Sequence, residues 1–191
     1  MDGGQYYQSA TTTDPIKYLE AGVYDNDLIA NKLSTAYGNI TYANAGSSAL
    51  SDITVKLMSG AVETAMDVSD VNGDYNMSSM DDGSYTLENT TAKAWGGLNG
   101  LDVILTKRFI ASLHTFTPLQ LLAADVNQNG SPDGLDVIMM KRRIAALSYP
   151  AWTAPDYVFE AQTLDVVSGI GSTDYQGLCS GDVNGSFTPA P

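Results

Sequence analysis

Oxygen-bearing residues recur at alternate positions of one short stretch, Asp125–Asp136, which reads Asp-Val-Asn-Gln-Asn-Gly-Ser-Pro-Asp-Gly-Leu-Asp. A hard cation such as calcium takes about six to eight oxygen ligands, and alternate residues of a tight loop point inward. Gly130, at the sixth position, permits the sharp turn that such a loop needs. The pattern therefore predicts a calcium site. Its expected ligands are Asp125, Asn127, Asn129, Ser131 through its carbonyl, Asp133 and Asp136.

The element that carries Asp136 belongs to an internal repeat. Gly100–Ile104 recurs as Gly134–Ile138, and each copy is followed by two residues, Leu105–Thr106 or Met139–Met140, and then by Lys107–Arg108 or Lys141–Arg142. Apolar residues continue at helical spacing after both copies, which predicts two helices. Between them, Thr117–Pro118 has the cap and first-turn residues of a short helix.

The first repeat lacks the front half of a calcium loop. When the two repeats are aligned, Thr91, Lys93 and Trp95 occupy the first three ligand positions. Only Asn99 and Asp102 remain as side-chain donors, and a lysine at a ligand position opposes a cation. This half loop cannot hold calcium by itself.

The C-terminal tail carries a front half without a loop. Asp182, Asn184 and Ser186 have the spacing of positions one, three and five. We predict that the tail folds back, so that these residues complete a second calcium site with Asn99 and Asp102. The alternative is an isolated Asx turn before a proline-containing end.

A third run of this kind, Asp70-Val-Asn-Gly-Asp74, has no carboxylate at position twelve. We interpret it as a hairpin turn rather than a calcium site. The region around it alternates apolar and polar residues with turn signals between short runs, which is typical of a β-sandwich. The strands expected there are 39–43, 53–58, 61–68, 73–77 and 84–87, and two later ones, 156–160 and 163–167, are candidates for missing edges.

Composition limits the function classes. The 191 residues are 43% hydrophobic, which suffices for a core, and 9 Lys+Arg against 22 Asp+Glu give a net charge of -13. This charge argues against nucleic acid or an anionic membrane as a partner. Cys179 is the only cysteine, so no internal disulfide is possible, and no apolar run is long enough to insert into a membrane. The first residues lack a signal-peptide pattern, so export is argued from other features.

Two resemblances follow from these motifs. Asp70–Tyr75 followed by Asp82–Leu87 resembles the closing signature of prealbumin-like, collagen-adhesin B-type sandwiches, which are Ig-like stalk modules of bacterial surface proteins. The stretch 125–136 has EF-hand spacing, with aspartate in place of the closing glutamate. Two such loop-plus-helix units joined by a short helix resemble the dockerin domain of cellulosome-type assemblies. That resemblance implies a cohesin partner that contacts Gly100, Leu101, Lys107 and Arg108, or Gly134, Leu135, Lys141 and Arg142.

The expected fold class is α+β: a small Ig-like, prealbumin-like β-sandwich plus a dockerin-like pair of calcium-loop helices, with C-terminal strands returning to the sandwich. We expect four segments. These are an N-terminal arm of unassigned packing (1–37), the Ig-like β-sandwich (38–90), the dockerin-like calcium domain (91–148) and the C-terminal strands with the tail (149–191).

No nucleophile elbow, phosphate-binding loop or dinucleotide fingerprint is present, and nothing local links His114 to Cys179. We therefore expect a non-catalytic, calcium-stabilised module that attaches or assembles proteins outside the cell or at its surface through a cohesin-like partner. The alternative is a structural subunit of an extracellular fibre, in which copies of the chain exchange strands because an unassigned arm accompanies an incomplete sandwich. A carbohydrate-binding face on the sandwich ranks last, since no aromatic platform is evident.

Overall fold

The computed structural model describes residues 34–148 and 151–190. The chain divides into two compact units, Met1–Leu33 and Ser34–Pro191, and the described residues belong to the second. Most of the N-terminal arm expected at 1–37 lies outside the described residues.

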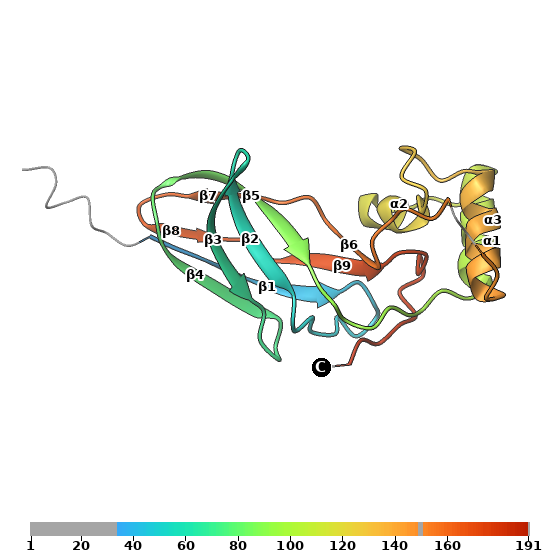
Figure 1. Ribbon diagram of the computed structural model, residues 1–191, viewed down its shortest axis with the longest axis horizontal. Coiled ribbons are helices and arrows are strands. Elements are labelled where there is room, and N and C mark those ends of the chain that lie inside the picture. The colour runs from blue at the N-terminus through green and yellow to red at the C-terminus, as the bar shows by residue number, and fades with distance from the viewer. Residues whose placement is uncertain (1–33, 149–150, 191) are drawn as a thin grey trace, which may run out of the picture. The chain divides into compact units, whose positions relative to one another are not determined.

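The second unit is a mixed α+β structure with two sheets and three helices among its described residues (Figure 1). The five strands before the helices are β1 (Ser34–Tyr42), β2 (Thr54–Ser59), β3 (Val62–Val68), β4 (Asp74–Met80) and β5 (Gly83–Thr90). The helices are α1 (Gly100–Ile110), α2 (Pro118–Ala124) and α3 (Gly134–Ile144). The four strands after them are β6 (Tyr157–Phe159), β7 (Thr163–Val166), β8 (Ile170–Ser172) and β9 (Tyr175–Cys179).

The strands that follow the helices complete both sheets. One sheet has the order β4-β1-β9-β6, with β8 also paired to β1, and the other has the order β3-β2-β5-β7. β7 pairs antiparallel with β5, whereas β8 and β9 run parallel to β1. The incomplete sandwich was the reason to consider strand exchange between copies. The chain's own C-terminal strands complete it.

Alternating burial explains why these segments form strands. Along β1, Ala36, Ile40 and Tyr42 are fully buried while the intervening side chains are at least partly exposed. The other sheet contributes Leu57 from β2 and Leu164 from β7 to the same core. Burial of each large apolar side chain stabilises the fold by about 1.5–3 kcal/mol.

The sequence did not indicate β8 and β9. Their segment is rich in glycine and serine, and its alternation is too short to stand out. Parallel pairing with β1 supplies the missing hydrogen bonds, an interaction between residues more than a hundred positions apart. Gly38 permits this approach, because a Cβ there would overlap the backbone of Thr173.

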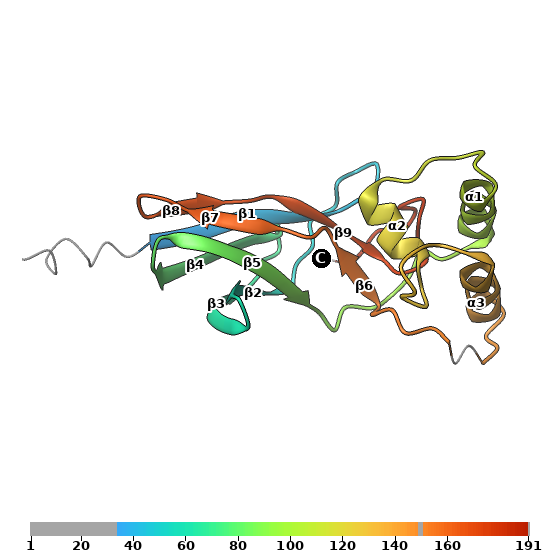
Figure 2. The same cartoon turned by 90° about the horizontal axis from the view of Figure 1, so that it is seen from above.

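Helices α1 and α3 lie side by side, and α2 contacts β6 and β9 (Figure 2). Both long helices begin with a capping box, in which Asn99 or Asp133 caps the helix and an aspartate three residues later returns a hydrogen bond. Thr117 caps α2 with Pro118 in the first turn, as the sequence predicted. None of the helices among the described residues is long and apolar enough to cross a membrane.

Candidate metal centre

The contiguous loop, Asp125–Asp136, starts where α2 ends, since Asp125 is the C-cap residue of that helix. The Oδ1 atom of Asp125 accepts a hydrogen bond from the Asn129 N–H at 3.1 Å, and its Oδ2 atom accepts one from the Gly130 N–H at 2.8 Å. The Asn129 N–H also donates to Asn127 Oδ1 at 2.9 Å. These bonds curl the loop around its acidic side chains.

The last residue of this loop, Asp136, is fully buried in the first turn of α3. Its Oδ1 atom accepts from the Asn127 N–H at 3.1 Å, and its Oδ2 atom accepts from the Asp133 N–H at 2.7 Å. Burial raises the pKa of Asp136, and Asp125 and Asp133 add to this through their charges. The amide nitrogen Nδ2 of Asn127 is buried and has no hydrogen-bond partner among the described residues.

The C-terminal tail folds back onto the first repeat. Asp182, Asn184 and Ser186 lie beside Asn99 and Asp102, which are eighty or more residues earlier in the chain. The Asn184 N–H donates to Asp102 Oδ1 at 3.1 Å, and Asn99 Nδ2 donates to Ser186 Oγ at 3.1 Å. We call the set formed by 97–102 and 182–187 the split loop.

The split loop repeats the hydrogen bonds of the contiguous loop. The Ser186 N–H donates to Asp182 Oδ1 at 3.0 Å and to Asn184 Oδ1 at 2.9 Å, as the Asn129 N–H does in the contiguous loop. The Phe187 N–H donates to Asp182 Oδ2 at 3.1 Å, where the contiguous loop uses its glycine. Asp102 thus stands where Asp136 stands in the other loop, on the third residue of its helix.

Gly97 occupies position seven of the split loop. Its carbonyl oxygen accepts hydrogen bonds from Asn99 Nδ2 at 2.9 Å and from Ser186 Oγ at 3.2 Å. Its φ of +90° favours glycine, and a Cβ there would overlap the Asp182 carboxylate. Sequence alignment of the repeats left this glycine unassigned, because its contact with the tail is made only in the folded chain.

Two carboxylates of the split loop are removed from water. Asp102 and Asp182 are both 0% exposed, and no ion pair found among the described residues involves either one. Burial raises the pKa of Asp102 to about 6, and the charge of Asp182 acts in the same direction. Buried charges are normally paired or bound to a metal, so this pair of carboxylates fits a site for a cation.

The donor set is mixed rather than purely acidic. Within 34–148 and 151–190, no group of three or more His, Cys, Asp or Glu side chains is arranged to hold a metal ion. A cation in either loop would therefore depend on amide, hydroxyl and carbonyl oxygens as well as carboxylates. Such a set suits calcium, which accepts neutral oxygens readily.

The residues at the front of the first repeat have other partners. The Lys93 ammonium donates to Ser51 Oγ at 2.8 Å and lies 3.5 Å from Asp52 Oδ2. The Trp95 ring lies 3.6 Å below the Arg143 guanidinium. These positions therefore anchor the linker before α1, and the tail replaces them in the loop.

The third Asp-x-Asn-x-Asp run forms a turn between β3 and β4. Asp70 Oδ1 accepts from the Asn72 N–H at 2.8 Å and from the Asp74 N–H at 3.0 Å. The Asn39 amide donates to Asp74 Oδ1 at 2.7 Å and to the Asn72 carbonyl at 2.9 Å. A hydrogen-bond donor from β1 thus serves this acidic turn. Because β3 and β4 belong to different sheets, the turn connects the two sheets and is not the hairpin turn expected from the sequence.

His114 and Cys179 have different surroundings. Cys179 is fully buried, and burial raises the pKa of its thiol. His114 packs edge-on against Phe116, with ring centroids 5.4 Å apart. Neither arrangement offers an activated nucleophile.

Each of the two long helices carries exposed apolar side chains followed by a basic pair. Leu101 and Ile104 of α1 are exposed, as are the equivalent Leu135 and Ile138 of α3. The Lys-Arg pairs of both helices follow them, with exposed lysines in each. Exposed apolar residues that recur in both repeats favour a protein-binding role for these helices.

The dockerin type I domain family model matches residues 96–145. The match includes both long helices and the contiguous loop, and it ends before the tail that completes the split loop. Residues 96–145 are therefore similar to a dockerin type I domain. No curated protein matched the chain in a sequence comparison.

Proposed function

We propose that this chain is a non-catalytic, calcium-stabilised module for protein attachment or assembly outside the cell, and that a cohesin-type domain is its partner. The dockerin match at 96–145 supports an assembly role, because dockerin domains bind calcium and cohesin partners. The β-sandwich, whose prealbumin-like identity is part of the proposal, serves as the stalk that carries the helix pair.

We further propose that both loops bind calcium. Asp125, Asn127, Asn129, the Ser131 carbonyl, Asp133 and Asp136 are the ligands of the contiguous loop; Asp182, Asn184, Ser186, Asn99 and Asp102, with the Gly97 carbonyl, are those of the split loop. The observation that carries this proposal is the shared hydrogen-bond frame, in which the closing aspartate accepts from the third-position N–H at 3.1 Å in both loops. Calcium would supply the positive charge that offsets the clustered carboxylates.

Calcium stoichiometry tests this proposal. Isothermal titration of the full chain should give two bound ions, and Asp125→Ala and Asp182→Ala should each remove one. One ion in the wild type that survives Asp182→Ala would restrict the site to the contiguous loop. Terbium luminescence on the same variants provides an independent count.

The partner surface is tested separately. We expect a panel of recombinant cohesin domains to contain a binder that requires calcium and is released by a chelator. Replacement of Lys141 and Arg142 by alanine, or of Lys107 and Arg108 in the matched variant, should weaken binding while the circular dichroism spectrum stays unchanged. A chain that binds no member of the panel but self-associates in size-exclusion chromatography would instead favour the fibre hypothesis.

A further inference from the structure

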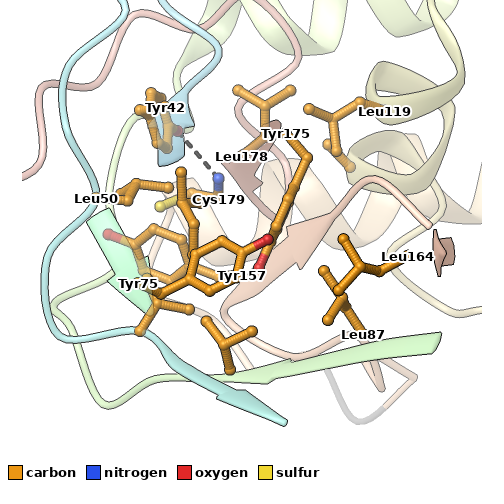
Figure 3. Packing of buried hydrophobic residues seen from close by; sticks show 14 of the residues in the cluster. Tyr42, Leu50, Tyr75, Leu87, Leu119, Tyr157, Leu164, Tyr175, Leu178 and Cys179 are labelled. Atoms are coloured by element: carbon orange, nitrogen blue, oxygen red, sulfur yellow. Dashed lines mark hydrogen bonds between the residues drawn. The ribbon is translucent and has the colours of Figure 1, made fainter. Parts of the chain in front are cut away.

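Tyr42, the last residue of β1, connects the core of the sandwich with the split loop. Its hydroxyl donates to Asp182 Oδ2 at 2.6 Å and accepts from the Cys179 N–H at 3.0 Å, the bond drawn in Figure 3. The side chain is 0% exposed. Its phenol O–H is the donor to the carboxylate, which can only accept.

This contact distinguishes the two loops. Asp182 Oδ2 accepts from both Tyr42 and the Phe187 N–H, whereas Asp125 Oδ2 accepts from the Gly130 N–H. No tyrosine donates to Asp125 among the described residues, and Asp125 is only partly buried. The first ligand of the split loop is thus oriented by a side chain of the sandwich.

Phe187 holds Tyr42 from the other side. Its ring meets the Tyr42 ring edge-on at 5.9 Å between centroids, and it lies over Gly96, where a Cβ would overlap it. The Phe187 carbonyl accepts from Asn44 Nδ2 at 2.9 Å. The tail is therefore attached to the end of β1 immediately after its ligand positions.

The same segment also reaches the helices. The Gly181 N–H donates to the Ala123 carbonyl at the end of α2 at 2.7 Å, and Gln120 Nε2 donates to the Val183 carbonyl at 2.7 Å. Val183 itself is fully buried. Residues 181–187 consequently contact β1, α1 and α2 at once.

We propose that Tyr42 is a positioning residue for the split loop, which holds the Asp182 carboxylate in the orientation that calcium needs and so couples calcium binding to the sandwich. This inference rests on the proposed function, that the split loop binds calcium. Loss of an outer partner that orients a metal ligand typically lowers metal affinity about 10- to 100-fold. The coupling is reciprocal, so calcium in this loop stabilises the sandwich as much as the sandwich favours calcium.

The test compares Tyr42→Phe with Tyr75→Phe in the full chain. Tyr75 is a matched control, because it is also buried in the sandwich and its hydroxyl donates to the Thr173 carbonyl at 2.8 Å, outside both loops. In calorimetric titrations, Tyr42→Phe should weaken one of two calcium sites about 10- to 100-fold and leave the other unchanged. Tyr75→Phe should leave both affinities unchanged.

A second measurement leaves Tyr42 in place, in case Tyr42→Phe folds poorly. During a calcium titration followed by NMR, the Tyr42 ring signals should shift with occupation of the split loop in an Asp125→Ala background. Equal calcium affinities for wild type and Tyr42→Phe, equal weakening by both tyrosine variants, or Tyr42 signals that ignore calcium would overturn the inference. A wild type with one ion that is lost in Asp125→Ala would instead overturn the split site itself, and the inference with it.

Discussion

The contiguous loop and the split loop hold equivalent hydrogen bonds but differ in how the chain supplies them. In the contiguous loop, a single segment from Asp125 to Asp136 carries every proposed oxygen ligand. Its Gly130, at position six, has a φ of +105°, and a Cβ there would meet no other atom. In the split loop the chain does not continue from position six to position seven. Phe187 can therefore occupy position six, and its ring packs against the sandwich.

The comparison shows that the demand for glycine depends on chain connectivity. When the loop is assembled from two segments, the position that requires glycine is Gly97. The Asp182 carboxylate lies so close to its backbone that a Cβ would overlap it. The two loops also differ in burial, since Asp182 is fully buried and Asp125 is half-buried. We expect calcium in the split loop to contribute more to tertiary structure than calcium in the contiguous loop.

Calcium removal should have the largest effect on the molecule. A ligand present at about 1,000 times its Kd stabilises the folded state by about 4 kcal/mol per site. We expect a chelator to lower the melting temperature followed by circular dichroism, and Asp125→Ala to retain part of the calcium-dependent increase through the split loop. An Asp125→Ala variant whose melting temperature ignores calcium would show that the contiguous loop accounts for all of it.

Asp182→Asn should destabilise the chain more in calcium than in chelator. In calcium the variant should be less stable than the wild type by about 1–3 kcal/mol, because a buried ligand loses its charge. In chelator the loss should be smaller: the amide gives up one of the two oxygens that accept backbone N–H bonds, but the repulsion between Asp182 and Asp102 is also removed. Asp125→Asn serves as the control and should change stability less in both conditions, as measured by urea unfolding.

Gly97→Ala and Gly130→Ala compare the glycines of the two loops. Both substitutions place alanine at a positive φ, which costs about 1–2 kcal/mol. Only the Gly97 variant also forces a Cβ against the Asp182 carboxylate. We expect Gly97→Ala to abolish calcium binding at the split loop in calorimetry, whereas Gly130→Ala should leave that loop intact. Equal losses at both loops in either variant would contradict this assignment.

The smallest effect concerns the basic residues at the end of α3. The Arg143 guanidinium lies between Trp95 and Trp152, 3.6 and 4.3 Å from their ring centroids, and pairs with Asp156 at 2.9 Å. Arg143→Ala should therefore lower the free energy of unfolding by about 1–2 kcal/mol. Arg142→Ala should leave the melting temperature nearly unchanged, and its effect should be sought in partner binding.

The two repeats have different residues at the position of Arg143, because the side chains there pack against different partners. Phe109 occupies in α1 the place that Arg143 has in α3, and it stacks on Phe116 with 4.9 Å between ring centroids. The Lys-Arg pairs are evident in the sequence because both repeats contain them. The arginine that the fold uses is the next residue, and only the positions of the two tryptophans reveal it.

Local spacing alone determined the contiguous loop and the helices beside it. Asp125 and Asp136 are eleven residues apart, so the geometry of one tight turn fixes their relation, and capping residues mark where α2 and α3 begin. Alternation likewise indicated five strands before the helices. These features depend on interactions between near neighbours, which a sequence pattern records directly.

Tertiary structure decided the rest. The sequence supplied the half loops at 99–102 and 182–186 as a hypothesis, but their approach depends on β9 pairing with β1 and carrying the tail past Tyr42. β8 and β9 have little intrinsic preference for strand and exist through those long-range hydrogen bonds. The same Asp-x-Asn spacing at 70–74 forms a turn that connects the two sheets, and there the Asn39 amide donates to Asp74. Residue types define what each segment can bind, and the packing of distant strands decides what each segment meets.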